Sequence, residues 1–245
     1  MRQGRALRAR RGCGNPSEPP ARRTRGRAGM DFEAARYAMV EGQVRTADVT
    51  RPEIVDVMRA LPREPFLPRS ERMLAYADLD PQVGEGRRML APRTFAKLLQ
   101  AAGVRQGELV LDVGCATGYS AVALARLAGF VSALEENAVL ADQAAQRLAE
   151  FEADSVALER GPLVAGAPGA GPYDVIVLEG GVEVQPQTLL DQLREGGRMV
   201  GVFMKGPVGS ARRWRRTAGT ISCVELFEVT APVLPGFDAA PAFSF

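Results

Sequence analysis

Two acids and two glycines near the middle of the chain are spaced as in a ligand-binding site of an α/β protein. Asp112 ends a short apolar stretch, and Gly114 and Gly118 lie in the turn that follows. Glu135 ends a second apolar stretch, 23 residues beyond Asp112. One strand, one helix and a second strand fill this spacing, so both acids are expected at the same edge of a parallel sheet, where ligands bind in such folds.

The turn after Asp112 excludes two kinds of phosphate-binding loop. A dinucleotide fingerprint would need glycine at positions 116 and 119, which are Ala116 and Tyr119, and no Gly-Lys-Ser/Thr triplet follows for a Walker loop. The pattern instead favours S-adenosylmethionine, whose ammonium group pairs with a carboxylate and whose ribose hydroxyls bind an acid. Glycines let the backbone pass close to such a cofactor. The alternative is that the two acids only cap exposed strand ends.

The chain of 245 residues contains no histidine. This excludes Ser-His-Asp triads, Cys-His dyads, His-Glu-x-x-His zinc sites and histidine general bases. The three cysteines are widely spaced, which gives no support for a disulfide framework or a metal site and fits a reducing, cytoplasmic setting. We expect Cys115 to be a buried turn residue and Cys223 a strand residue.

Residues 1–29 differ sharply in charge from the rest of the chain. They hold nine arginines and one acid, a net charge of +8, which leaves −6 for the remainder because the whole chain carries +2. Three interpretations compete: upstream DNA translated from a misplaced start with Met30 as the true initiator, a basic nucleic-acid-binding tail, or an arginine-rich transit peptide. We favour the first and expect disorder, because the segment has neither an apolar core nor a helical period.

Residues 30–91 are predicted to form a helical cap. Apolar spacing indicates a helix that starts at Asp31 and ends before Thr46. Thr50 is the expected N-cap of a second helix. The proline-rich segment 61–68 should break that helix and run extended over the surface.

Residues 92–245 alternate short apolar stretches with helical patterns, which is typical of a doubly wound, mostly parallel α/β sheet, here with a last antiparallel strand. We expect Trp214 on a surface helix and the aromatic C-terminal tail, with Phe237, Phe243 and Phe245, docked onto the body. The predicted strands are 108–114, 130–135, 155–159, 173–180, 196–203 and 219–229, and the predicted helices are 92–102, 117–129, 137–151 and 186–193.

Several blocks of the sequence then support a more specific interpretation: AMVEGQVR, LPREPFLP followed by AYADLD, LVLDVGCATGYSAVALARL, PYDVIVLEGG and LLDQLREGGRMVGV. In order and approximate spacing the chain resembles the protein-L-isoaspartate O-methyltransferase family over nearly its whole body. The resemblance implies a Rossmann-like class I methyltransferase for protein repair, which uses S-adenosylmethionine to esterify the α-carboxylate of L-isoaspartyl residues. It implies a protein or peptide substrate. The residues themselves give no support for a nucleic-acid partner, because the body is acidic, or for a membrane partner, because the sequence has no run of 18 apolar residues.

Carried over by position, the resemblance assigns the ribose-binding acid to Glu135 and places the segment ending at Leu163 beside the adenine, without the usual acidic acceptor. On the substrate side, Arg88 and Leu90 stand where the family has hydroxyl side chains. Arg88 is therefore our candidate for binding the substrate carboxylate, and the alternative is a solvated loop cation. The cofactor-loop residues assigned in this way are Asp112, Gly114, Ala116 and Gly118.

A carboxylate nucleophile is already ionised at neutral pH, since its pKa is ~4, so methyl transfer to it needs no general base. The absence of histidine therefore leaves this reaction possible. Two other functions stay open: a methyltransferase of the same fold with a different substrate, and a non-catalytic binding protein of that fold.

Overall fold

The computed structural model describes residues 30–84 and 86–240. The predictions for residues 1–29, and the docking of Phe243 and Phe245, lie outside the described residues. From Asp31 onward the described residues form one compact unit, and the predicted boundary at residue 91 stays a prediction. Among the described helices, none is long and apolar enough to cross a membrane.

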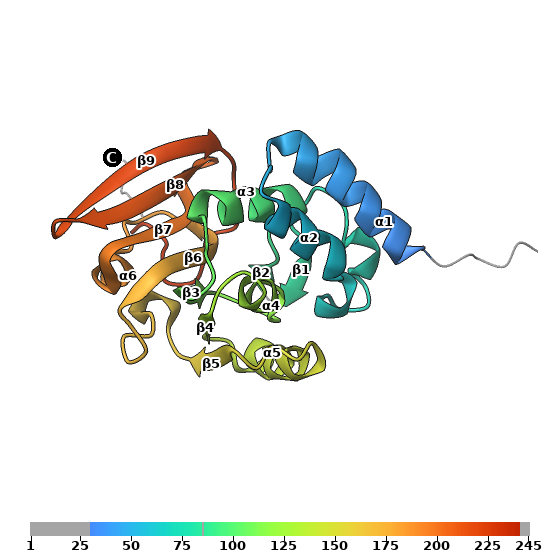
Figure 1. Ribbon diagram of the computed structural model, residues 1–245, viewed down its shortest axis with the longest axis horizontal. Helices are drawn as coiled ribbons and strands as arrows, with labels where there is room; N and C mark the ends of the chain where they lie inside the picture. The colour runs from blue at the N-terminus through green and yellow to red at the C-terminus, as the bar shows by residue number, and fades with distance from the viewer. Residues whose placement is uncertain (1–29, 85, 241–245) are drawn as a thin grey trace, which may run out of the picture. The chain divides into compact units, whose positions relative to one another are not determined.

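Seven strands form one sheet in the order β5-β4-β3-β6-β7-β8-β9 (Figure 1). The first five strands of this order run parallel to one another. Strand β8 is antiparallel to β7, and β9 is antiparallel to β8. The predicted doubly wound, mostly parallel sheet with a final antiparallel strand is thus confirmed. The strands are β3 (Leu109–Val113), β4 (Phe130–Glu135), β5 (Val156–Arg160), β6 (Tyr173–Val182), β7 (Leu193–Lys205), β8 (Val208–Thr217) and β9 (Thr220–Glu228).

The order of strand addition reverses at β3. The chain adds β4 and β5 on one side of it and then returns to place β6 on the other. At such a switch point the two following connections leave in opposite directions, which opens a crevice at the carboxyl ends of the strands. The turn after Asp112 lies at this point.

Alternate strand residues face two separate apolar cores. Val110 and Val175 belong to the core with the cap, α3, α4 and α5, while Leu111 and Ile176 face α6 and the C-terminal segment. Phe237 is buried in the second core, which confirms its predicted docking. The helices are α3 (Pro92–Ala102), α4 (Tyr119–Ala125), α5 (Ala138–Glu150) and α6 (Gln187–Asp191).

Trp214 lies on strand β8 and not on the predicted surface helix. It pairs with Cys223 of β9 in the antiparallel ladder, and its side chain is buried in the core that contains α6. The adjacent residues Arg213 and Arg215 are exposed, as the alternation of side chains along a strand requires. A run of arginines around one aromatic has no helical apolar period, and the ladder to β7 and β9 decides the conformation. Cys223 is a strand residue and Cys115 a buried turn residue, as predicted.

The first helix of the cap continues past its predicted end. After α1 (Phe32–Met39) the chain forms a π-helical turn (Val40–Val44) and a 3-10 turn (Arg45–Ala47). Thr46 fits inside this turn because its hydroxyl donates to the Gly42 carbonyl at 2.8 Å.

The second cap helix, α2 (Pro52–Ala60), has Arg51 rather than Thr50 at its N-cap. The Thr50 amide instead donates to the Gln100 side chain of α3 at 2.7 Å, so that contact between helices replaces the predicted cap.

The segment 61–68 ends α2 after Ala60, as predicted, but the predicted extended path is wrong, because a 3-10 turn interrupts it and four of its eight residues are buried. A 3-10 turn (Glu64–Phe66) carries Phe66 into the core, and even Arg63 is 0% exposed. The Arg63 guanidinium donates to the Ala75 carbonyl at 2.9 Å and the Leu90 carbonyl at 2.7 Å. Hydrogen bonds to backbone oxygens make the burial of this charge possible, and they join this segment to two later parts of the cap.

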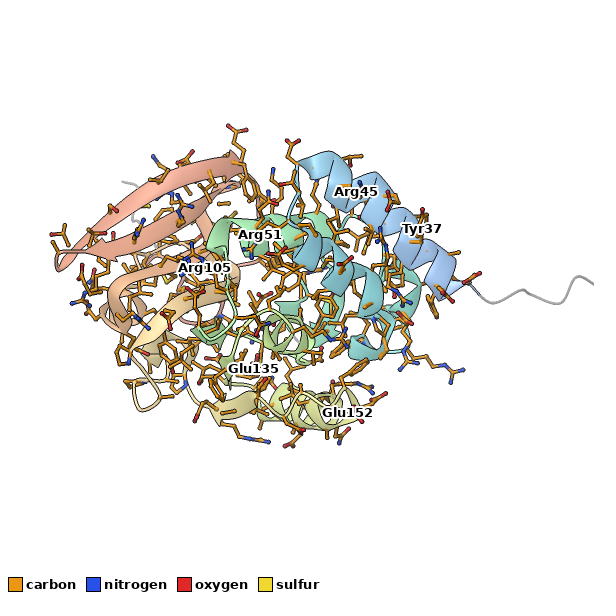
Figure 2. The ribbon with its side chains drawn as sticks, in the orientation of Figure 1. Tyr37, Arg45, Arg51, Arg105, Glu135 and Glu152 are labelled. Atoms are coloured by element: carbon orange, nitrogen blue, oxygen red, sulfur yellow. The ribbon has the colours of Figure 1, made fainter. Side chains whose placement is uncertain are left out.

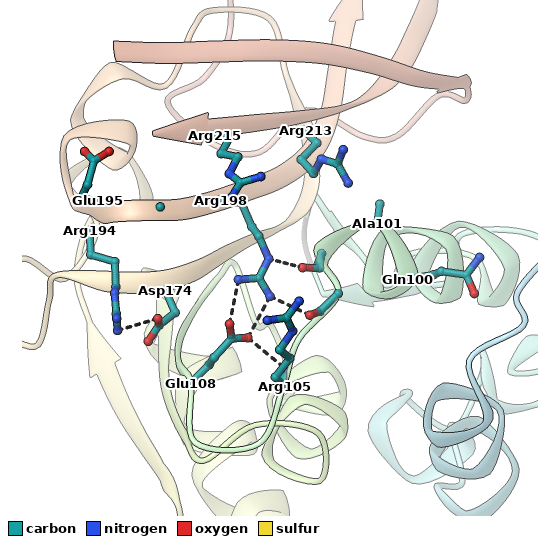
Figure 3. A pocket seen from close by; sticks show the side chains of 13 residues that line it. Gln100, Ala101, Arg105, Glu108, Asp174, Arg194, Glu195, Arg198, Arg213 and Arg215 are labelled. Atoms are coloured by element: carbon teal, nitrogen blue, oxygen red, sulfur yellow. Dashed lines mark hydrogen bonds and ion pairs between the residues drawn. The ribbon is translucent and has the colours of Figure 1, made fainter. Parts of the chain in front are cut away.

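Arg198 of β7 joins the end of α3 to the sheet through hydrogen bonds (Figure 3). Its guanidinium donates to the Ala102 and Gly103 carbonyls at the end of α3 and makes a bidentate pair with Glu108 at 2.8 and 2.9 Å. The helix therefore ends on a cation that satisfies its last carbonyls.

Candidate functional site

The site begins at the carboxyl end of β3, where Asp112 is completely buried. Its Oδ2 accepts the Ser120 hydroxyl at 2.7 Å, and its Oδ1 has no hydrogen-bond partner among the described residues. Burial, with a smaller contribution from the nearby Glu135 charge, raises the pKa of Asp112 from 3.8 to about 7. A buried acceptor without a donor is suited to a positively charged ligand group.

The turn after Asp112 has an unusual backbone. Gly114, Ala116 and Gly118 all have positive φ, at 82°, 50° and 93°. A side chain at Gly118 would contact Ala144 of α5 at 3.4 Å, so this glycine lets the next helix pack against the turn. Ala116 adopts the left-handed conformation with a Cβ, which is strained by about 1 kcal/mol.

Glu135, at the end of β4, is buried and fully engaged (Figure 2). Its Oε2 accepts the Ala116 amide at 2.8 Å, and its Oε1 accepts the Asn137 amide at 3.0 Å. The same Oε1 pairs with the Arg87 guanidinium at 2.7 Å. The two acids predicted from the sequence are therefore brought together around one turn.

Arg87 comes from a short hairpin that the sequence did not predict, formed by β1 (Gln82–Gly84) and β2 (Arg87–Arg88). Its Nη2 donates to the Gly114 carbonyl at 2.9 Å, and it lies 2.9 Å from where a side chain on Gly114 would begin. Leu163 and Leu234 lie over the same glycine, at 3.6 and 3.1 Å. Leu163 is thus adjacent to the turn, and its assignment to the adenine stays a prediction.

Glu179 is a further acid near the site that sequence reasoning did not single out. It lies near the end of β6, is 8% exposed, and its Oε1 has no partner among the described residues. Burial and the charge of Asp112 raise the pKa of Glu179 well above its usual value. The signal was present, because the LEGG sequence repeats the pattern of an acid and glycine that end an apolar strand.

A small cavity of about 20 Å³ adjoins the turn, lined in part by Leu90, Phe95 and Glu179. This is room for about one water molecule. Arg88 lies on its rim, exposed, with its guanidinium donating to the Asp80 carbonyl at 2.8 Å. The structure therefore places Arg88 beside the turn after Asp112 but outside the cluster around Asp112 and Glu135.

The residues around this turn fit S-adenosylmethionine in their chemistry. Asp112 offers the orphaned oxygen that an ammonium group needs, and Glu135 offers a carboxylate at the next strand end. The positive φ angles of the turn bring the backbone close to the space above Gly114. That space is occupied by the Arg87 side chain in this structure.

The sheet order, the switch point and the acids at the ends of β3 and β4 define a Rossmann-like methyltransferase. Comparison with solved structures agrees. A protein-L-isoaspartate O-methyltransferase superposes with a TM-score of 0.71 at 23% identity, over 84% of this chain and 66% of that protein. A putative protein-L-isoaspartate O-methyltransferase from Plasmodium falciparum, in complex with S-adenosyl-L-homocysteine, gives 0.70 at 16% identity over 83% and 97%. At these identities the likeness concerns the fold.

Sequence comparison identifies the family. The model of the protein-L-isoaspartate(D-aspartate) O-methyltransferase family matches residues 35–224. Protein-L-isoaspartate O-methyltransferase 1 of Rhodopseudomonas palustris (strain HaA2) is 38% identical over 205 residues, covering 81% of this chain and 82% of the relative. Protein-L-isoaspartate O-methyltransferase 2 of Anaeromyxobacter sp. (strain Fw109-5) is 35% identical over 82% and 79%. The chain belongs to the protein-L-isoaspartate(D-aspartate) O-methyltransferase family.

Proposed function

We propose that this protein transfers a methyl group from S-adenosylmethionine to the carboxylate of L-isoaspartyl residues in damaged proteins or peptides. Family membership supports the reaction and the substrate class. The observation that carries the cofactor is the buried pair Asp112 and Glu135 at adjacent strand ends, where Asp112 keeps an unpartnered oxygen.

Each residue of the turn has a role in this proposal. Asp112 binds the ammonium group of the cofactor, and Glu135 binds the ribose hydroxyls. Gly114 and Ala116 keep side chains away from the cofactor, and Gly118 supports the turn through its contact with α5. Leu163 is buried beside Gly114 and provides an apolar surface for the adenine.

When bound, the cofactor supplies an electrophilic methyl group. The chain itself has to align the acceptor and exclude water, because a carboxylate with a pKa of ~4 arrives ionised and needs no proton acceptor. Alignment alone can lower a barrier by roughly 7 to 11 kcal/mol. The buried side chains of Leu90 and Phe95 supply an apolar wall beside the turn.

Arg88 is the proposed contact to the substrate carboxylate. Its exposed position on the cavity rim allows a loose contact. A tight ion pair would stabilise the ground-state anion more than the transition state and would slow the transfer.

We also propose that residues 30–91 act as the substrate-side cap of a methyltransferase domain at 92–245. The protein would act in the cytoplasm, where the exposed thiol of Cys223 stays reduced.

Two measurements test the function. Calorimetry with S-adenosylmethionine should detect binding, and the exchange Asp112→Ala should weaken it at least tenfold, whereas Asp56→Ala, on the exposed face of α2, should not. Methyl incorporation should then be higher into an isoaspartyl peptide than into its aspartyl control. Equal labelling of both peptides would favour a different substrate, and failure to bind millimolar cofactor would contradict the enzyme assignment.

A further inference from the structure

Arg87 makes the contacts that the proposed cofactor would need for itself. Its side chain is about 95% buried, pairs with Glu135 at 2.7 Å and donates to the Gly114 carbonyl at 2.9 Å. Glu135 already accepts three hydrogen bonds, two at Oε1 from Arg87 and the Asn137 amide and one at Oε2 from the Ala116 amide, so both ribose hydroxyls can bind it only if Arg87 leaves. A ribose bound at Glu135 and the Arg87 guanidinium in its present place would require the same carboxylate and the same space.

The charges match as well as the positions. S-adenosylmethionine carries a sulfonium, an ammonium and one carboxylate, a net charge of +1, and a guanidinium carries the same charge. The acids Asp112, Glu135 and Glu179 are almost completely buried, and Arg87 lies near enough to lower the pKa values of Asp112 and Glu179 against the effect of burial. Arg87 thus neutralises the acids with a cation that is part of the chain, where the cofactor would bring its own.

We propose that Arg87 is an internal competitor for the cofactor, and that its ion pair with Glu135 sets the affinity for S-adenosylmethionine. This inference depends on the proposed function, because it assumes that Glu135 binds the ribose. Binding then requires the guanidinium to leave Glu135 and to be replaced there by the cofactor.

The position of Arg87 in the fold allows this exchange. Strand β2 has two residues and pairs with β1 alone, apart from the seven-stranded sheet. Arg87 can therefore leave Glu135 without breaking a strand pair of the main sheet. The apparent dissociation constant equals the intrinsic one divided by the fraction of molecules in which Arg87 has left. If about one molecule in 10 to 100 is in that state, removing the side chain tightens binding by the same factor.

The test is calorimetry with S-adenosyl-L-homocysteine, which has the ribose and the ammonium group but no sulfonium, and with S-adenosylmethionine in the absence of acceptor, which adds the sulfonium charge. The variants are R87A, which removes the competitor, R87K, which restores a cation, and R126A, which removes an exposed arginine just after α4. We expect R87A to bind 10- to 100-fold more tightly than the natural protein, and R87K and R126A to stay within about threefold of it. Rescue by lysine separates a competing charge from a general loosening of the hairpin.

A thermal melt provides an independent readout. Without added ligand, R87A should melt at a lower temperature, because Glu135 loses its buried counterion. Saturating S-adenosyl-L-homocysteine should raise the melting temperature of R87A by more than it raises that of the natural protein. If R87A fails to fold, R87Q keeps an amide donor for Glu135 and serves in both measurements.

The outcomes separate the two proposals. If the natural protein binds the ligand and R87A binds equally or more weakly, Arg87 is a cofactor ligand or a bystander, and the competition is refuted while the proposed function stands. If neither protein binds at millimolar ligand, the proposed function fails and the competition fails with it.

Discussion

Replacing Asp112 by asparagine should make the protein more stable at alkaline pH while it loses affinity for the cofactor. The carboxyl is buried in the fold, which raises its pKa from 3.8 to about 7. Between these values the folded state binds more protons than the unfolded state, so stability falls as the pH rises from about 4 to about 7 and then stays level. Each pKa unit corresponds to about 1.4 kcal/mol, so the ionised side chain destabilises the fold by up to about 4 kcal/mol above pH 7.

Asparagine cannot ionise, and it keeps an oxygen that can accept the Ser120 hydroxyl. Its second group is an amide with unpaired N–H donors, which offsets about 1 to 3 kcal/mol of the gain. The expected net effect of D112N at pH 8, without added cofactor, is a stabilisation of about 1 to 3 kcal/mol, which disappears or reverses near pH 4.5. The affinity for S-adenosyl-L-homocysteine should fall at least tenfold, since the ammonium group loses its counterion.

Urea unfolding of both proteins at half-unit steps between pH 4.5 and 8.5 measures the difference directly. Groups distant from the site titrate alike in both proteins and cancel in the comparison, whereas the pKa of Glu179, which the Asp112 charge raises, should fall in D112N and add to the gain in stability. Two stability curves that run parallel across this range would show that Asp112 titrates normally and would refute the account of its burial. Ser70→Ala, an exposed change outside the site, should follow the natural protein at every pH.

Three further predictions concern the same molecule. A116G should raise the free energy of unfolding by about 0.5 to 1 kcal/mol, because glycine relieves the left-handed strain at φ 50°. A lower free energy of unfolding in denaturant would show that the strain is absent. E179Q should be more stable than the natural protein at pH 9 and about equal at pH 5, since the raised pKa of Glu179 makes its ionisation unfavourable; a pH-independent difference in melting temperature would contradict this. R198M should destabilise by about 2 to 4 kcal/mol through loss of its pair with Glu108 and of two bonds to the end of α3. R194M should change stability by less than about 1 kcal/mol, because Arg194 is 55% exposed and its partner Asp174 keeps the hydrogen bond from the Leu109 amide.

The sheet and the two acids could be predicted because their signals are local. Apolar stretches that end in an acid and a glycine, spaced by one helix, determine both the parallel pairing and the edge at which Asp112 and Glu135 meet. The helix predicted over 137–151 is α5, which begins after Asn137 because that side chain caps it by accepting two amides.

The errors share a physical cause, because each depends on a partner distant in sequence. The residues around Trp214 predict a surface helix, and only the pairing of β8 with β7 and β9 makes this segment a strand. Arg63 lies in a segment predicted to run over the surface, and its burial depends on hydrogen bonds to the carbonyls of Ala75 and Leu90, which are distant in sequence. The contact between Arg87 and Glu135 joins residues 48 apart, and no short motif reports it.

The hydrogen bonds of Arg63 have a consequence for the side chain at residue 90. Two hydrogen bonds fix the backbone at residues 90 and 91. The Arg63 guanidinium donates to the Leu90 carbonyl, and the Ala91 amide donates to the Asp80 carboxylate at 2.6 Å. Neither bond uses the side chain of residue 90. The path of the backbone and the side chain presented at residue 90 are therefore set by different residues, so another side chain at this position leaves both hydrogen bonds in place.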